Sequence, residues 1–203
     1  MKIICVGRNY IEHAKELNNS VPKEPVLFLK PETAIVPKKN PFFIPDFSED
    51  VHYEAELVVK INKVGKNIQE KFAHKYYNQL TVGLDFTARD IQQKQKEKGL
   101  PWEIAKAFDG SAAIGKFMEI SELDNPEDPT FSLLLNGKKV QSAKPSEMIF
   151  PIHKLIAEIS KYFTLKIGDL IFTGTPKGVG KLTKNDQMHL YLEEKEVLQL
   201  NVK

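Results

Sequence analysis

Two glutamates separated by one residue lie in the segment from Val51 to Val59, which otherwise has the apolar pattern of a buried strand. Because the side chains of a strand alternate between its two faces, Glu54 and Glu56 are predicted to project from the same face. Two adjacent carboxylates need a cation, and the hard cations Mg²⁺, Mn²⁺ and Ca²⁺ suit oxygen ligands best. As an isolated motif, the pair is also compatible with the solvated face of an edge strand.

A third carboxylate and a lysine extend this chemistry. Asp85 follows the apolar residues at the end of a second predicted strand, so it is either the third metal ligand or a cap for the helix that begins near Ala88. Lys106 stands between apolar residues, and its ammonium must reach solvent or find an anionic partner. An anionic substrate would be such a partner, whereas a surface lysine is the alternative.

Two helical pairs could transfer protons or bind a substrate. His13 and Glu16 are three residues apart on a short predicted helix, so the carboxylate can orient the imidazole as a general base. Arg89 and Gln92 have the same spacing on a later helix and could donate hydrogen bonds to a substrate carboxylate. Both pairs are also compatible with ordinary contacts on a helix surface.

A glycine-rich loop covers residues 173–181 and contains Thr175. Such a loop lets the backbone approach an anion closely, although a tight structural turn is equally compatible with it. The loop is not a phosphate-binding P-loop, because Leu182 stands where Ser or Thr is needed next to Gly180-Lys181.

Most of the elements that must position these residues are predicted strands. The clearest of these elements is a hairpin over residues 131–142, because Asn136-Gly137 favours a type I′ turn between two predicted strands. A capping box at Thr87–Asp90 and a first-turn proline at Pro151 mark the starts of two helices. Strands are predicted at 3–6, 26–29, 54–60, 80–86, 131–135, 138–142, 170–173, 188–192 and 197–202. Helices are predicted at 10–17, from near residue 88 to residue 98, and over 151–163. Strands and helices do not alternate regularly, which argues against a doubly wound sheet or a (β/α)₈ barrel.

Composition limits the class of protein. The 203 residues suit one domain, 1–203, and the net charge of +2, from 29 basic and 27 acidic residues, is well mixed. We therefore expect neither nucleic acid nor a membrane as a partner. The single cysteine, Cys5, excludes an internal disulfide, and no signal peptide is recognisable, so a cytoplasmic location is expected.

Six segments, in order, resemble the fumarylacetoacetate hydrolase family, and most closely its short single-domain acylpyruvate hydrolase and oxaloacetate decarboxylase group. The resemblance runs from Ile3 to Lys203. It is carried by Val6–Tyr10, Phe28–Pro31, Tyr53–Glu56, Leu84–Gln92, Lys106–Phe108 and Thr173–Gly180. Together the six segments are far more specific than any one of them.

The resemblance implies an α+β, strand-rich fold: a mixed β-sandwich roll with a few short helices, usually dimeric. It implies Mg²⁺ or Mn²⁺, with Ca²⁺ as a possible substitute, held by the positions that match Glu54, Glu56 and Asp85. His13 and Glu16 match the family's lid helix, near 10–17, and Lys106 would help to hold a pyruvate enolate. The positions that the family uses around its substrate match Arg8, Lys30, Arg89, Gln92 and Thr175.

The implied activity is hydrolysis of a carbon–carbon bond in acylpyruvates, decarboxylation of oxaloacetate, or both, on a small 2-oxo acid substrate. An alternative on the same metal site is an isomerase or hydratase of 2-hydroxy-dienoic diacids. The presence of His13 and Glu16 favours the hydrolase, because an isomerase needs no activated water. A non-catalytic metal- or ligand-binding protein is the second alternative, which an incomplete acidic triad would have favoured.

Overall fold

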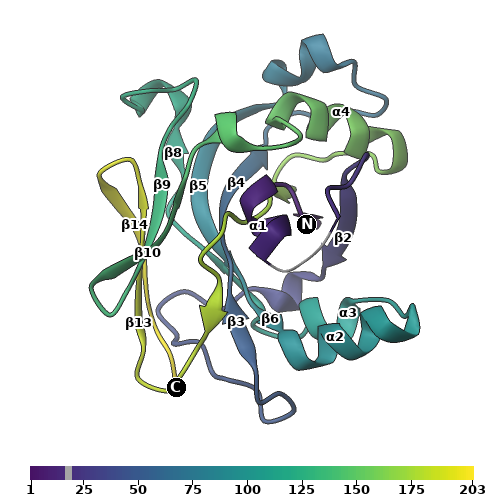
Figure 1. Ribbon diagram of the computed structural model, residues 1–203. Coiled ribbons are helices and arrows are strands. Elements are labelled where there is room, and N and C mark those ends of the chain that lie inside the picture. Colours follow the sequence, from purple (N-terminus) through teal and green to yellow (C-terminus); the bar gives the residue numbers. More distant parts are fainter. Residues whose placement is uncertain (17–19) are drawn as a thin grey trace.

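The computed structural model describes residues 1–16 and 20–203, and these form three sheets with short helices around them (Figure 1). The largest sheet has the strand order β2-β1-β11-β4-β5-β7, with β8 also paired to β5. β1 pairs with β11 in parallel, and the other strand pairs that the described residues form in this sheet are antiparallel. The strands are β1 Ile3–Gly7, β2 Val26–Lys30, β4 Ala55–Ile61, β5 Tyr77–Asp85, β7 Ala112–Ile114, β8 Met118–Glu119 and β11 Leu170–Phe172.

A second, antiparallel sheet packs against the largest one. It has the order β10-β9-β13-β14. Leu57 and Leu84 of the large sheet join Leu133 and Leu190 of the second sheet in one buried cluster, so the main core lies between the two sheets. The strands of the second sheet are β9 Phe131–Leu135, β10 Lys138–Ala143, β13 Gln187–Leu192 and β14 Lys195–Asn201. A small third sheet consists of β12 Gly180–Lys181, β3 Val51–Tyr53 and β6 Thr87–Ala88.

Four α-helices cover the ends of the sheets in the described part of the chain. They are α1 Ile11–Glu16, α2 Arg89–Lys98, α3 Glu103–Lys106 and α4 Ile152–Tyr162. Helix α4 buries one apolar face, as its period-3.6 pattern predicts. Figure 1 places α2 and α3 together at the opposite end of the molecule from α4, with α1 between the two ends. Short 3₁₀ turns lie at Glu32–Ala34, Glu70–Lys75, Ile120–Glu122 and Pro145–Glu147.

The strand-rich fold with few short helices is confirmed, and so are two of its turns. Asn136 and Gly137 have φ angles of 52° and 80°, the left-handed values that the hairpin turn requires. Gly99 ends α2 with a φ of 64°, as predicted. The predicted end of the first helix, at Leu17, lies outside the described residues.

The strand predicted over 54–60 is confirmed as β4, one residue later at each end, and Glu54 lies where the chain passes from the small sheet to the large one. One local prediction is wrong. The capping box does not form, because the Thr87 hydroxyl lies 2.5 Å from the Lys106 ammonium and makes no capping hydrogen bond to α2. A contact with a lysine from another part of the chain thus replaces the local pattern.

Among the described residues, no helix is long and apolar enough to cross a membrane.

Candidate active site

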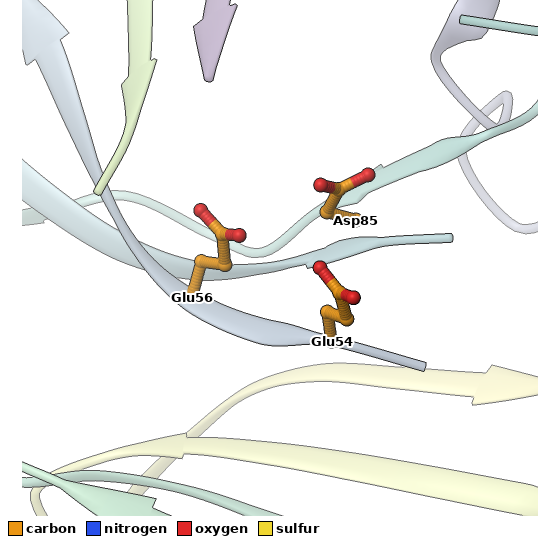
Figure 2. Close-up of side chains that lie close together, drawn as sticks. All are labelled: Glu54, Glu56 and Asp85. Carbon is orange, nitrogen blue, oxygen red and sulfur yellow. The ribbon is translucent and has the colours of Figure 1, made fainter. Parts of the chain in front are cut away.

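The structure brings Glu54, Glu56 and Asp85 together at one end of the large sheet (Figure 2). One carboxylate oxygen from each residue lies within 4.8 Å of the others. All three side chains are buried, with exposed fractions of 5%, 2% and 1%. Burial excludes the solvated strand face as the explanation of the glutamate pair.

Backbone pairing sets the spacing of the triad. Glu54 lies at the junction of β3 and β4, Glu56 lies inside β4, and Asp85 is the last residue of β5. The two strands are antiparallel, and the Asp85 N–H donates to the Glu54 carbonyl at 2.8 Å. Asp85 therefore lies opposite Glu54, and it does not cap α2. Residues 29 and 31 positions apart in the chain meet because the sheet register aligns them.

Three cations surround these carboxylates. The Lys106 ammonium lies 2.8 Å from Glu54 Oε2 and 2.7 Å from Asp85 Oδ2. The Arg89 guanidinium lies 2.5 Å from Glu54 Oε1. The Lys30 ammonium lies 2.8 Å from Asp85 Oδ1. The apolar neighbours of Lys106 in the sequence thus reflect a buried lysine with anionic partners.

The two glutamates differ electrostatically. Burial favours the neutral form of Glu54, but Lys106 and Arg89 outweigh it and hold the pKa of Glu54 well below its usual range. Burial, reinforced by the charges of Asp85 and Glu54, raises the pKa of Glu56 well above its usual range. Glu56 accepts a hydrogen bond from Gly174 N–H at 2.7 Å but has no cationic side chain beside it among the described residues. The negative charge of Glu56 is therefore the one that no neighbouring cation of the site compensates directly.

The triad fits a divalent cation. It offers only carboxylate oxygens, which are the ligands that Mg²⁺ and Mn²⁺ prefer. Asp85 Oδ1 is buried and, although close to Lys30, receives no well-directed hydrogen bond. An incompletely satisfied Asp85 oxygen beside an uncompensated Glu56 is what a site built for an added cation would have.

Helix α1 brings His13 to the same cavity. His13 is buried, and its Nδ1 lies 3.3 Å from Glu16 Oε2. Glu16 also accepts a hydrogen bond from Gly178 N–H at 3.0 Å, which ties α1 to the glycine-rich loop. Burial lowers the pKa of His13, and Glu16 and Glu54 only partly oppose this effect. A neutral imidazole with one nitrogen held by a carboxylate can accept a proton at the other nitrogen.

The cavity in front of the triad is small. Its free volume is about 30 Å³, roughly the space of one water molecule. A multi-carbon acid therefore needs a movement of the lining groups. The predicted residues that line it are Arg8, His13, Glu54, Glu56, Asp85, Arg89, Gln92, Lys106 and Thr175.

Lys30 has a different place from the other predicted substrate contacts. It does not line the cavity, and its fully buried ammonium contacts Asp85, Ser111 and the Lys106 carbonyl. An ammonium has only three N–H groups, and those of Lys30 point to the Lys106 carbonyl and to the carbonyl and hydroxyl of Ser111. Lys30 therefore stands behind Asp85 as its ion-pair partner, and its predicted contact with substrate stays a prediction.

Sequence reasoning missed several residues of the site. Lys96, Trp102 and Phe28 line the cavity. Lys96 lies four residues after Gln92 and seven after Arg89, so helical spacing alone could have placed it on their face. Gln141 is a different case, because it donates to Thr175 Oγ1 at 2.9 Å and accepts from Ala55 N–H at 2.9 Å across two sheets. No local signal in the hairpin marks it.

Comparison with known proteins now adds to this geometry. The model of the fumarylacetoacetate (FAA) hydrolase C-terminal family matches residues 2–203. The chain belongs to the fumarylacetoacetate hydrolase family. The mitochondrial oxaloacetate tautomerase FAHD1 of Mus musculus is 42% identical over 201 residues, covering 99% of this chain and 91% of that protein. The oxaloacetate tautomerase YcgM of Escherichia coli is 45% identical over 188 residues, covering 92% and 86%.

A solved relative of the family shares the fold at full length. The fumarylpyruvate hydrolase of Pseudomonas aeruginosa, in complex with Mn²⁺ and pyruvate, superposes with a TM-score of 0.91 at 36% identity. The match covers 100% of this chain and 89% of that one. The expected fold of this family is thereby confirmed. These relatives support an enzyme with a divalent-metal site formed by the buried acidic triad.

Proposed function

We propose that this protein is a divalent-metal-dependent enzyme that interconverts the keto and enol forms of oxaloacetate. The observation that carries the proposal is the buried acidic triad, together with a neutral histidine on the same cavity. The names of the two tautomerases, which match this chain over nearly its whole length, support the substrate.

Charge balance supports a doubly charged substrate. The charges of the three carboxylates are matched by Lys30, Arg89 and Lys106. A divalent cation held by Glu54, Glu56 and Asp85 would add two positive charges, and Arg8 and Lys96 also line the cavity as cations. This excess of positive charge in a buried site favours an acid with two carboxylates over an acid with one. When bound, the metal would act as a Lewis acid toward the 2-oxo group.

The chain's own residues can complete the reaction. His13 has the neutral imidazole needed to remove a proton from the carbon between the oxo group and the second carboxylate. Glu16 holds Nδ1, so Nε2 is the atom that takes the proton. Lys106 remains charged, because Asp85 and Glu54 raise its pKa against the effect of burial, and its charge stabilises the developing enolate. The proton returns to the oxygen or to the carbon, which interconverts the two forms.

Hydrolysis of an acylpyruvate is the second candidate, and the His13 and Glu16 pair favours it. The pair would activate a water toward the distal carbonyl, and the same enolate would leave as pyruvate. Decarboxylation of oxaloacetate shares this enolate and needs no water nucleophile. The fumarylpyruvate hydrolase of similar fold supports keeping this candidate.

The test is an assay of oxaloacetate enol, followed by its ultraviolet absorbance, beside assays of pyruvate release from oxaloacetate and acetylpyruvate. The metal-loaded wild type is expected to speed enol interconversion, and chelation to abolish this. A matched control is Glu49→Gln, which removes an exposed carboxylate and should change nothing. Rapid pyruvate release without any effect on the enol would reject the tautomerase in favour of the second candidate.

Three further expectations stay predictions. They are a single domain over 1–203, a homodimer and a cytoplasmic location. Light scattering and limited proteolysis of the purified chain would test the first two, and fractionation of cells the third.

A further inference from the structure

One face of α2 presents three side chains to the cavity. Arg89, Gln92 and Lys96 have the spacing i, i+3 and i+7, and all three line it. Arg89 is held by Glu54 and by Gln92, at 2.5 and 2.8 Å. The Lys96 ammonium makes no hydrogen bond or ion pair with any residue in the described ranges. Of the two cations on this face, Arg89 is therefore paired with protein groups and Lys96 is not.

A second unpaired cation accompanies Lys96. Arg8 also lines the cavity and has no anionic partner within residues 1–16 and 20–203. The Lys96 ammonium lies 5.7 Å from the centre of the Trp102 ring, and the Arg8 guanidinium 5.9 Å from it. Burial, with the nearby charges of Arg89 and Arg8, lowers the pKa of Lys96 to about 8. Two cations held together in this way would be stabilised by an anion.

This arrangement is fixed by the fold. Trp102 packs on Phe28, with ring centres 6.1 Å apart, and its Cζ3 lies 3.5 Å from where a Cβ of Gly7 would stand. Arg8 has a φ of 60°, a conformation that its side chain disfavours. The next residue, Asn9, maintains this turn by donating to the carbonyls of Phe150 and Thr173. Unfavourable backbone conformations that the surroundings enforce are typical of functional sites.

We propose that Lys96 is a specificity-determining residue: with Arg8 beside the same Trp102 ring, it binds the substrate carboxylate that lies farther from the acidic triad. This inference rests on the proposed function and adds to it the residues that distinguish diacids from monoacids. Lys30, Arg89 and Lys106 are paired with protein carboxylates. Arg8 and Lys96 are the lining cations without such partners among the described residues, and a ligand carboxylate would supply one to both.

The experiment compares two ligands that differ in one group. Oxaloacetate and 2-oxobutyrate share four carbons and the 2-oxo acid end, but oxaloacetate ends in a carboxylate where 2-oxobutyrate ends in a methyl group. Trp102 is the single tryptophan of the chain, so its fluorescence reports binding directly. Each ligand is mixed with the Mg²⁺-loaded protein in a stopped-flow instrument, and binding is measured before turnover. The variants are Lys96→Met and Lys96→Arg, with Lys94→Met, on the exposed side of α2, as the matched control.

Lys96→Met is expected to weaken oxaloacetate binding about tenfold, the usual effect of losing one charged hydrogen bond. Binding of 2-oxobutyrate should stay within about twofold. Lys96→Arg should retain most of the preference, and Lys94→Met should match the wild type. Equal weakening of both ligands by Lys96→Met, or no weakening of either, would overturn the inference while leaving the proposed function intact. If the wild type binds neither acid and turns over neither, the proposed function itself is wrong.

Discussion

Two parts of the cavity wall differ in how they are built: the acidic triad, which we call the floor, and helix α1, which we call the lid. Glu56 and Asp85 stand on β4 and β5, two long paired strands of the large sheet, and Glu54 directly precedes β4, with buried cations around all three. His13 stands on α1, a helix of six residues that is tied to the glycine-rich loop through Glu16. An isolated helix of this length has no stability of its own. The floor can therefore hold a metal in fixed geometry, whereas α1, which buries only His13 and Ala14 of its six residues, is the element that we expect to act as the lid.

This difference gives the two regions different functions. A metal site needs its ligands in place before the metal binds, and packed strands supply that. A base that must exclude water during reaction is better placed on an element that closes after the substrate is bound. The small cavity is consistent with a lid in its closed position.

Removing a carboxylate from the floor should have the largest effect. Glu56→Gln is expected to lower the affinity for Mn²⁺ at least about 100-fold, since even partners that only support a ligand contribute up to this much. Activity should fall with it, because Glu56 lies in the triad. Titration calorimetry with Mn²⁺ measures the effect, and Glu49→Gln is the control. Unchanged Mn²⁺ affinity would show that the triad is not the metal site.

Removing the base from the lid should lower activity and leave the metal in place. His13→Asn is expected to slow enol interconversion about 100-fold or more, with Mn²⁺ affinity unchanged. In the wild type, burial lowers the pKa of His13, so the base is neutral at pH 7 and activity is lost only as the pH falls through that lowered value. A pH profile of kcat/KM for the two proteins tests this. A parallel loss of metal binding would remove the distinction between floor and lid.

Weakening the attachment of the lid should have a smaller effect. Glu16→Gln keeps the size of the side chain but removes the charge that faces His13 and Gly178. Since the Glu16 carboxylate partly offsets the lowering of the His13 pKa by burial, the acid limb should move to lower pH and the rate should fall about tenfold. Hydrogen exchange should become faster in α1 and not in β5. Equal acceleration in both elements would mean that lid and floor open together.

A substitution at the other end of β4 from the acidic triad, where Asp169 lies beside Ile61, should change stability alone. Asp169 accepts hydrogen bonds from the backbone N–H groups of Lys2 and Lys166, and it pairs with the Lys2 ammonium at 2.5 Å. Burial alone raises the pKa of Asp169, but the Lys2 side chain and these N–H groups outweigh it, so the net pKa is lowered. Asp169→Asn is expected to lower the free energy of unfolding by about 1–2 kcal/mol at pH 7.

The pH dependence of that effect has a fixed sign. A depressed carboxyl pKa adds stability above the unfolded value of about 3.9, and this contribution disappears as the pH falls through the folded value. The difference between Asp169→Asn and the wild type should therefore shrink in urea unfolding at acid pH. A difference that stays constant with pH would assign the effect to packing, and a loss of activity would contradict a purely structural function.

The chain's local patterns determined much of this protein. Apolar runs, Asn136-Gly137 and Gly99 specify their strands and turns because backbone preference acts within a few residues. Six ordered segments were enough to indicate the family, which the family model confirms over residues 2–203. The acidic triad was found for the same reason, since Glu54, Glu56 and Asp85 stand in these segments.

Tertiary structure alone decided how those residues are used. Thr87 has the pattern of a helix cap, but its hydroxyl contacts Lys106, which arrives from 19 residues away. Lys30 matches a position that the family uses around its substrate, but here its ammonium donates to Ser111 and pairs with Asp85. Lys96 resembles a surface lysine, but the packing of Trp102 brings it beside Arg8 at the cavity. Local sequence fixes where a charged group stands in its own element. Only the folded chain brings the partners that decide whether that group is paired, buried or left for a ligand.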